Sequence, residues 1–203
     1  MDIVLASRNK KKIAELQELM KEVASVKVNI LSLDDIGITG DIEENGLTFE
    51  DNARIKASVG AKKGYITIAD DSGLCVDALN GAPGVHSARF SGGDDNDNNR
   101  LLIEKLQGLP TEKRSARFVS SVVCIFPDQN YEIVTEGKTE GFITEQPSGT
   151  NGFGYDPYFY YSPLGKTFAQ LSPDEKNAIS HRGKAMRAFA EKLDTFIKQQ
   201  NLV

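Results

Sequence analysis

The hydrophobic positions along the chain predict helices that alternate with strands at first and neighbouring strands later. Strands are expected where apolar residues run together or alternate, at residues 2–6, 26–30, 66–71, 116–126 and 131–134. Helices are expected where apolar residues recur every three or four positions, at residues 13–23, 48–63, 94–107 and 173–199. This order predicts an α/β protein with a mixed sheet.

Polar residues and glycines mark the predicted boundaries. Thr48 with Asp51 three residues on forms a capping box for the second helix. Ser172 is the expected N-cap of a single last helix, with Pro173 in its first position. The glycines from residue 137 to residue 154 predict loops after the strand at 131–134.

Length and composition predict one globular domain, residues 1–203, without internal repeats or a linker. The chain is 39% hydrophobic and 26% charged, as in ordinary globular proteins. A net charge of −5 argues against the broad basic surface of a general nucleic-acid binder. No apolar run approaches the length of a membrane span, so we expect neither nucleic acid nor membrane as a partner.

The cysteines, the start of the chain and the histidines each add one expectation. Cys75 and Cys124 lie in apolar, strand-like runs and are expected to be reduced. The chain also starts without the basic and apolar segments of a secretory signal, so we expect a cytoplasmic protein. With only His86 and His181, and no pair at ligand spacing, a zinc site is not expected.

Two adjacent carboxylates, Asp70 and Asp71, follow the apolar residues Ile68 and Ala69, where the strand is expected to leave the sheet. Carboxylates beside a dry core need a cation or strong donors. Open α/β sheets place ligand sites beyond the carboxyl ends of strands. The pair therefore indicates an active-site edge that binds a hard metal such as Mg²⁺. The alternative is a polar turn with a positive φ at Gly73.

Cations crowd the start of the first helix, in the segment Ser7-Arg8-Asn9-Lys10-Lys11-Lys12. Each exposed cation at a helix N-terminus costs roughly 0.3–1 kcal/mol, whereas the free N–H groups there favour an anion. The segment therefore favours phosphate binding, although the Walker spacing is absent. The alternative is a solvated basic patch.

A second acidic pair, Glu43-Glu44, precedes the second helix. A Mg²⁺ ion that already holds phosphate oxygens needs only one or two protein carboxylates. One carboxylate from each acidic pair would therefore suffice. Taken alone, such a pair is more often a surface charge pair, and it gains weight only from the other segments.

Residues 152–157 place Phe153 and Tyr155 among glycines. Aromatic rings stack on nucleobases, and glycine lets backbone N–H groups approach a ligand. The alternative is a hairpin corner with both rings in the core. In the last helix Arg182 falls within the apolar stripe and Gly183 follows it, which favours a ligand at that position over an internal ion pair.

Residues 94–99 are rich in Asp and Asn and begin with the oxygen spacing of a calcium loop. Counting from Asp95, however, Arg100 stands where glycine is required and Leu106 where a bidentate glutamate is required. We therefore interpret the segment as a helix cap and a solvated loop.

Taken in order, several segments resemble the inosine triphosphate pyrophosphatase family, the non-standard purine NTP (dITP/XTP) pyrophosphatases. The segments are Ser7-x-Asn9-x-x-Lys12, Glu43-Glu44-x-Gly46-Leu47-Thr48-Phe49, Asp70-Asp71-Ser72-Gly73-Leu74, Gly81-Ala82-Pro83-Gly84, Ser87-Ala88-Arg89, Gly152-Phe153-Gly154-Tyr155-Asp156-Pro157 and Ser180-His181-Arg182-Gly183. Each is weak alone, but the ordered set spans nearly the whole chain. The chain departs from the family in the first loop, where relatives often have glycines and this chain has Arg8 and Lys11.

The resemblance implies a long curved mixed β-sheet with flanking helices, two lobes around a central cleft that holds the active site, and a homodimer. It implies Mg²⁺-dependent hydrolysis of ITP, dITP or XTP between the α- and β-phosphates. The products would be the monophosphate and pyrophosphate. The reaction would thereby cleanse the nucleotide pool of non-standard nucleotides.

The resemblance also implies roles for individual residues. Glu43 and Asp71 would bind Mg²⁺, Asp71 would also accept a proton, and Lys12 would stabilise the leaving pyrophosphate. Glu44 and Asp70 would support them. The implied nucleotide contacts are Ser7, Arg8, Asn9, Lys10, Lys11, Lys12, Ser72, Phe153, Gly154, Tyr155, Asp156, Lys176, His181 and Arg182. Two other functions stay open, a pyrophosphatase for modified pyrimidine nucleotides and a non-catalytic nucleotide sensor.

Overall fold

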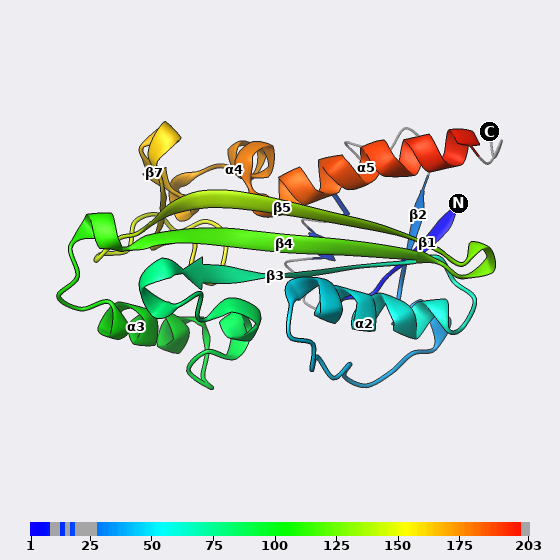
Figure 1. The fold of residues 1–203 in the computed structure, drawn as a ribbon, viewed down its shortest axis with the longest axis horizontal. Helices are drawn as coiled ribbons and strands as arrows, with labels where there is room; N and C mark the ends of the chain where they lie inside the picture. Colours follow the sequence, from blue (N-terminus) through cyan, green and yellow to red (C-terminus); the bar gives the residue numbers. More distant parts are fainter. Residues whose placement is uncertain (9–12, 15–16, 19–27, 200–203) are drawn as a thin grey trace. The chain divides into compact units, whose positions relative to one another are not determined.

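The computed structural model describes residues 1–8, 13–14, 17–18 and 28–199, which form a seven-stranded sheet flanked by helices (Figure 1). The strands are β1 (Asp2–Leu5), β2 (Asn29–Ser32), β3 (Thr67–Val76), β4 (Ser115–Phe126), β5 (Tyr131–Ile143), β6 (Phe159–Tyr161) and β7 (Lys166–Thr167). The helices are α2 (Phe49–Ala61), α3 (Asp95–Lys105), α4 (Pro173–Ile179) and α5 (His181–Gln199).

The sheet order is β2-β1-β3-β4-β5-β6-β7. β1 pairs in parallel with β2 and β3, whereas β6 pairs antiparallel with β5 and β7. The predicted mixed sheet is therefore confirmed. Among the described helices, none has the length and apolar character needed to cross a membrane.

The chain divides into two compact units, as the predicted two lobes require. The first unit comprises Met1–Asp71, Ser120–Gly137 and Arg182–Val203, and the second comprises Ser72–Val119 and Lys138–His181. Strands β3, β4 and β5 each begin in one unit and end in the other. Asp71 and Ser72 are therefore adjacent in β3 yet belong to different units. That residues 1–203 form one domain stays a prediction.

In the first unit, alternate strand residues pack against different helices. Ile3, Leu5 and Ile68 pack in a cluster with α5, which supplies Met186, Phe189 and Leu193. Val4, Ala6 and Ala69 pack in a second cluster with Ala53 and Ala57 of α2. Successive strand residues point to opposite faces of a sheet. Within this unit, α5 and α2 therefore cover opposite faces (Figure 1).

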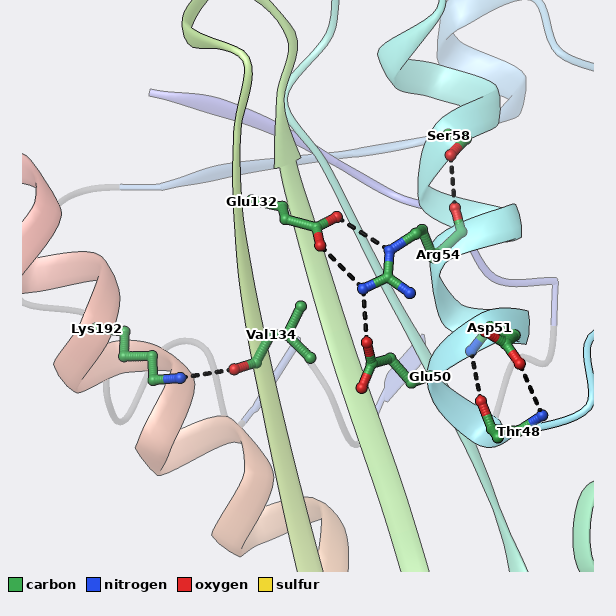
Figure 2. A network of polar contacts seen from close by, with 8 residues as sticks. All are labelled: Thr48, Glu50, Asp51, Arg54, Ser58, Glu132, Val134 and Lys192. Carbon is green, nitrogen blue, oxygen red and sulfur yellow. Dashed lines mark hydrogen bonds and ion pairs between the residues drawn. The ribbon is translucent and has the colours of Figure 1, made fainter.

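Helix α2 begins as the sequence predicts and is tied to β5 by an arginine (Figure 2). Thr48 and Asp51 form the predicted capping box, in which each side chain bonds the backbone N–H of the other. One turn on, Arg54 binds both carboxylate oxygens of Glu132 on β5, at 3.1 and 2.9 Å, and also binds Glu50. Cap and ion pairs together fix how α2 lies against the sheet of this unit.

The second unit has an aromatic core. Phe118 of β4 lies with its ring centroid 4.6 Å from that of Phe159 and 5.6 Å from that of Phe168. Leu102 of α3 and Leu106, the C-cap of that helix, join the same cluster, as does Tyr155. Aromatic rings provide much of the buried apolar area of such a core.

Three predicted boundaries are wrong. β3 continues through Asp70 and Asp71 to Val76 and does not end at the pair. β5 is much longer than residues 131–134, so Gly137 and Gly141 lie in a strand. The predicted last helix is two helices, because Ser180 has extended backbone angles (φ −70°, ψ 157°) between α4 and α5. Of the predicted helix at 13–23, residues 13–14 and 17–18 are helical and the rest lie outside the described residues.

Candidate active site

Asp70 and Asp71 lie inside β3, and both side chains are buried, with exposed fractions of 2% and 5%. The polar-turn interpretation is therefore wrong. Asp70 is two residues beyond Ile68, which faces α5, and Asp71 is two residues beyond Ala69, which faces α2. The two carboxylates accordingly point to opposite faces of the sheet.

Asp71 forms a buried polar cluster with α2. Its Oδ1 lies 3.0 Å from Nζ of Lys56, and its Oδ2 accepts a hydrogen bond from Nδ2 of Asn52 at 3.2 Å. The Lys56 ammonium also lies 3.3 Å from Oε1 of Glu44. Asn52 in turn accepts a hydrogen bond from the N–H of Gly46, which anchors the loop that carries the second acidic pair.

The cluster is strongly charged. Burial alone would lower the pKa of the Lys56 ammonium, but the charges of Asp71, Asp70 and Glu44 together raise that pKa above its ordinary value. Lys56 is therefore a cation at neutral pH. Carboxylates beside a dry core need such compensation, and here a lysine of the protein provides it.

Asp71 and Glu44 offer hard oxygen donors, which suit Mg²⁺. Among the described residues, no three His, Cys, Asp or Glu side chains are grouped as a complete metal centre. An ion that takes most of its ligands from phosphate and water needs only one or two carboxylates from the protein. Glu43 is exposed, whereas Glu44 is half-buried and contacts the cluster.

On the other face of the sheet, Asp70 pairs with Arg182. The Arg182 Nε lies 3.3 Å from Oδ2 of Asp70, and both side chains are at least 95% buried. The internal ion pair, which the sequence analysis disfavoured, is thus present. Because α5 begins at His181, Gly183 lies in its first turn and not in a helix interior. The cost expected for a glycine within a helix therefore does not apply.

The basic segment is described only in part. Arg8 donates to Oδ1 of Asp34 at 3.1 Å and to the carbonyl of Ile38 at 2.8 Å, and so holds the segment after β2. Ser7 is half-buried just after β1. Asn9, Lys10, Lys11 and Lys12 lie outside the described residues. Phosphate binding by this segment stays a prediction.

In the second unit, Asp156, Lys176 and Phe153 form a compact group. Oδ2 of Asp156 accepts from Nζ of Lys176 and from the N–H of Phe153, each at 2.9 Å. The Lys176 ammonium lies 5.0 Å from the centroid of the Phe153 ring, within range of a cation–π interaction. Asp156 and Lys176 are both buried.

Two other predicted contact residues are built into the core of this unit. Tyr155 is 5% exposed, and its hydroxyl donates to the carbonyl of Ser87 at 2.8 Å. The ring of His181 stacks on Phe118, with centroids 4.8 Å apart. Ser72 directly follows Asp71 in β3. Contact of these three with a nucleotide stays a prediction.

Two residues of the site, Lys56 and Asn52, were not predicted from the sequence. Both lie on the buried face of α2, one turn apart and beside the small residues Ala53 and Ala57. A helical projection of residues 49–61 would have shown a lysine and an amide on the face of the small residues. A lysine there requires a buried anion.

A model of the Ham1 family matches residues 3–192. The chain belongs to the Ham1 family. It is 46% identical, over 204 residues, to the dITP/XTP pyrophosphatase of Clostridium perfringens, an alignment that covers 96% of this chain and 98% of that one. Identity to the dITP/XTP pyrophosphatase of Bacillus licheniformis is also 46%, covering 95% of this chain and 98% of that one.

Solved structures agree. A HAM1 protein from Coxiella burnetii superposes on this chain with a TM-score of 0.87 at 39% sequence identity. The superposition covers 96% of this chain and 99% of the Coxiella burnetii chain. A nucleoside-triphosphatase / dITP/XTP pyrophosphatase from Mycobacterium abscessus gives a TM-score of 0.77 at 47% identity, covering 93% of this chain and 98% of its own. The family resemblance and the fold inferred from the motifs are both confirmed.

Proposed function

We propose that this Ham1-family chain hydrolyses the non-standard purine nucleotides dITP, XTP and ITP to the monophosphate and pyrophosphate. The observation that carries the proposal is the buried Lys56–Asp71–Glu44 cluster, in which a cation holds two carboxylates beside the sheet. Relatives that match nearly the whole chain are named dITP/XTP pyrophosphatases, which supports the same substrate class.

Asp71 acts as the proton acceptor for the attacking water. Its carboxylate is fixed by Lys56 and Asn52, so it is oriented before substrate binds. Mg²⁺, held by Asp71 with Glu43 or Glu44, would supply Lewis acidity and neutralise phosphate charge when bound. Lys12 and the N–H groups of the first helix would stabilise the charge on the leaving pyrophosphate.

The group formed by Phe153, Asp156 and Lys176 serves the base. A flat ring stacks on a purine, and Lys176 donates toward a 6-oxo group. Such a donor rejects the 6-amino group of adenine, because the N–H that points at the base would meet another donor and not an acceptor. Further nucleotide contacts are assigned to Ser72, Gly154, Tyr155, His181 and Arg182, and the phosphates to Ser7, Arg8, Asn9, Lys10 and Lys11.

The protein is further proposed to act as a homodimer in the cytoplasm, where its substrates arise in the nucleotide pool. Thiols at Cys75 and Cys124 that are not joined in a disulfide fit a reducing compartment.

Pyrophosphate release with Mg²⁺ over a panel of XTP, dITP, ITP, GTP, ATP and modified pyrimidine nucleotides tests the function. We expect release from the first three to exceed release from ATP by at least about tenfold, because a donor to the 6-oxo group rejects adenine, and to exceed release from GTP as well, as the names of the relatives imply. Equal rates on all purine nucleotides would contradict the proposed specificity. Release of orthophosphate in place of pyrophosphate would contradict cleavage between the α- and β-phosphates. A preference for the pyrimidine nucleotides, or binding without turnover, would establish one of the two alternatives.

A further inference from the structure

Two residues of α3 hold both backbone polar groups of Gly154. The N–H of Gly154 donates to Oδ2 of Asp95 at 3.0 Å, and its carbonyl accepts from Nδ2 of Asn99 at 2.9 Å. Asp95 and Asn99 are four residues apart, so they lie on the same face of the helix. Gly154 itself is in the left-handed region, with φ of 60°.

The peptide held in this way carries the residues assigned to the base. Gly154 directly follows Phe153 and lies two residues before Asp156. Those two are joined by the hydrogen bond from the Phe153 N–H to the Asp156 carboxylate. A displacement of Gly154 therefore moves the ring and the carboxylate together.

The predicted helix cap at the start of α3 is confirmed, but two of the residues interpreted as solvated, Asn98 and Asn99, are buried. The helix does begin with a capping box, formed by Asp94 and Asp97. Asn98 and Asn99, however, are only 2% and 7% exposed. Asn98 accepts from the N–H and hydroxyl of Ser91 and donates to the carbonyl of Ala88.

The charge of Asp95 also reaches this loop. Burial raises the pKa of the Tyr155 hydroxyl, and the negative charge of Asp95 raises it further. The Asp95 carboxylate thus lies close to the loop and accepts the hydrogen bond from the Gly154 N–H.

We propose that Asp95 and Asn99 are positioning residues for base recognition: by fixing Gly154 they set where Phe153 and Asp156 meet the purine. The inference rests on the proposed function. Residues 94–99 contain none of the predicted site residues. The inference gives them a role in binding XTP and the other non-standard purine nucleotides.

The test compares Asp95→Ala, Asp95→Asn, Asn99→Ala and Asn99→Asp with the wild type, using pyrophosphate release from XTP and GTP and thermal melting. Misplacement of a binding group by about 1 Å can cost about 10²-fold, so we expect KM for XTP to rise about 5- to 50-fold in Asp95→Ala and both Asn99 variants. kcat should stay within about twofold, because Asp71 is untouched. Asp95→Asn keeps an acceptor for the Gly154 N–H and should restore most of the affinity.

Asn96→Ala is the matched control, since Asn96 is an exposed amide on the same turn of α3. A purely structural role would lower the melting temperature and the active fraction and leave KM unchanged. Wild-type KM in folded Asp95→Ala and Asn99→Ala would overturn this inference alone. Absence of pyrophosphate release from any purine nucleotide by the wild type would overturn the proposed function, and this inference with it. Asp95 is exposed, so its variants carry the test even where Asn99→Ala does not fold.

Discussion

The ammonium of Lys56 lies 3.0 Å from the carboxylate of Asp71, and both side chains are more than 90% buried. Removing one partner of a buried pair leaves a charge that is poorly compensated, which costs about 3–5 kcal/mol. Lys56→Met should therefore lower the free energy of unfolding by about that amount in urea denaturation. Lys62→Met, at an exposed lysine just after the same helix, should change it by no more than about 0.5 kcal/mol.

The same pair predicts a coupled loss in the double variant. In Lys56→Met/Asp71→Asn both charges are gone, so the double variant should be less destabilised than the sum of the two single variants. If the destabilisation of the double variant equals the sum of the destabilisations of the two single variants, the two side chains do not interact in solution.

Asp71→Asn should abolish turnover while the chain remains folded. Loss of a positioned general base typically lowers kcat about 10²- to 10⁴-fold. Asp77→Asn provides the control, because Asp77 is an exposed carboxylate that pairs with Arg117. The measurement is pyrophosphate release from XTP, with circular dichroism to verify the fold. A fully active Asp71→Asn variant would remove Asp71 from the mechanism.

Arg182 should contribute to stability through Asp70 as well as to nucleotide binding. Arg182→Met leaves the buried Asp70 carboxylate without its guanidinium and should cost about 3–5 kcal/mol. Adding Asp70→Asn should recover a large part of that loss, because it removes the buried negative charge. Lys184→Met, at an exposed position on the same helix, is the control. If Arg182→Met has the same melting temperature as the wild type, the Asp70–Arg182 ion pair does not stabilise the protein.

Two glycines in one loop separate backbone strain from a steric effect on Asp156. Gly152 and Gly154 both have positive φ, of 75° and 60°, so alanine at either position costs roughly 1–2 kcal/mol. A Cβ at Gly152 would overlap Oδ2 of Asp156, whereas one at Gly154 meets nothing within 4 Å. Gly152→Ala should therefore lower the melting temperature and raise KM for XTP more than Gly154→Ala does, because only the Gly152 variant also displaces the buried Asp156 carboxylate. Equal KM values for the two variants would show that Asp156 does not contact substrate.

The sequence predicts the helix starts well because capping is local. Thr48 and Ser172 lie at the N-caps that their side chains predict, since each bonds a backbone N–H only three residues away. The family motifs were equally informative, because they identify the fold without any knowledge of contacts.

Strand ends and buried partners depend on tertiary contacts, so the sequence predicts them poorly. Gly141 marks a place of close approach within β5 and not a loop, because a Cβ there would lie 2.5 Å from the carbonyl oxygen of Tyr160. Asp70 and Asp71 interrupt an apolar run, yet β3 continues through them because Arg182 and Lys56 compensate their charges. A helical pattern can mark each cation as unusual, but both are remote in sequence from the carboxylates, so no local pattern reveals which carboxylate each one pairs with.

Acid should weaken the helix caps. Hydrogen bonds from Thr48 lower the pKa of Asp51 below 3.8, and the backbone N–H of Ser172 lowers that of Glu175 below 4.5. A carboxyl group whose pKa is lower in the folded state contributes stability that is complete above its unfolded pKa. That contribution is lost as the pH falls through the folded pKa. Asp51→Asn and Glu175→Gln should therefore destabilise the protein more at about pH 6 than near pH 3. Urea denaturation at the two pH values measures this, and a difference that does not change with pH would show that the two carboxylates do not stabilise the caps.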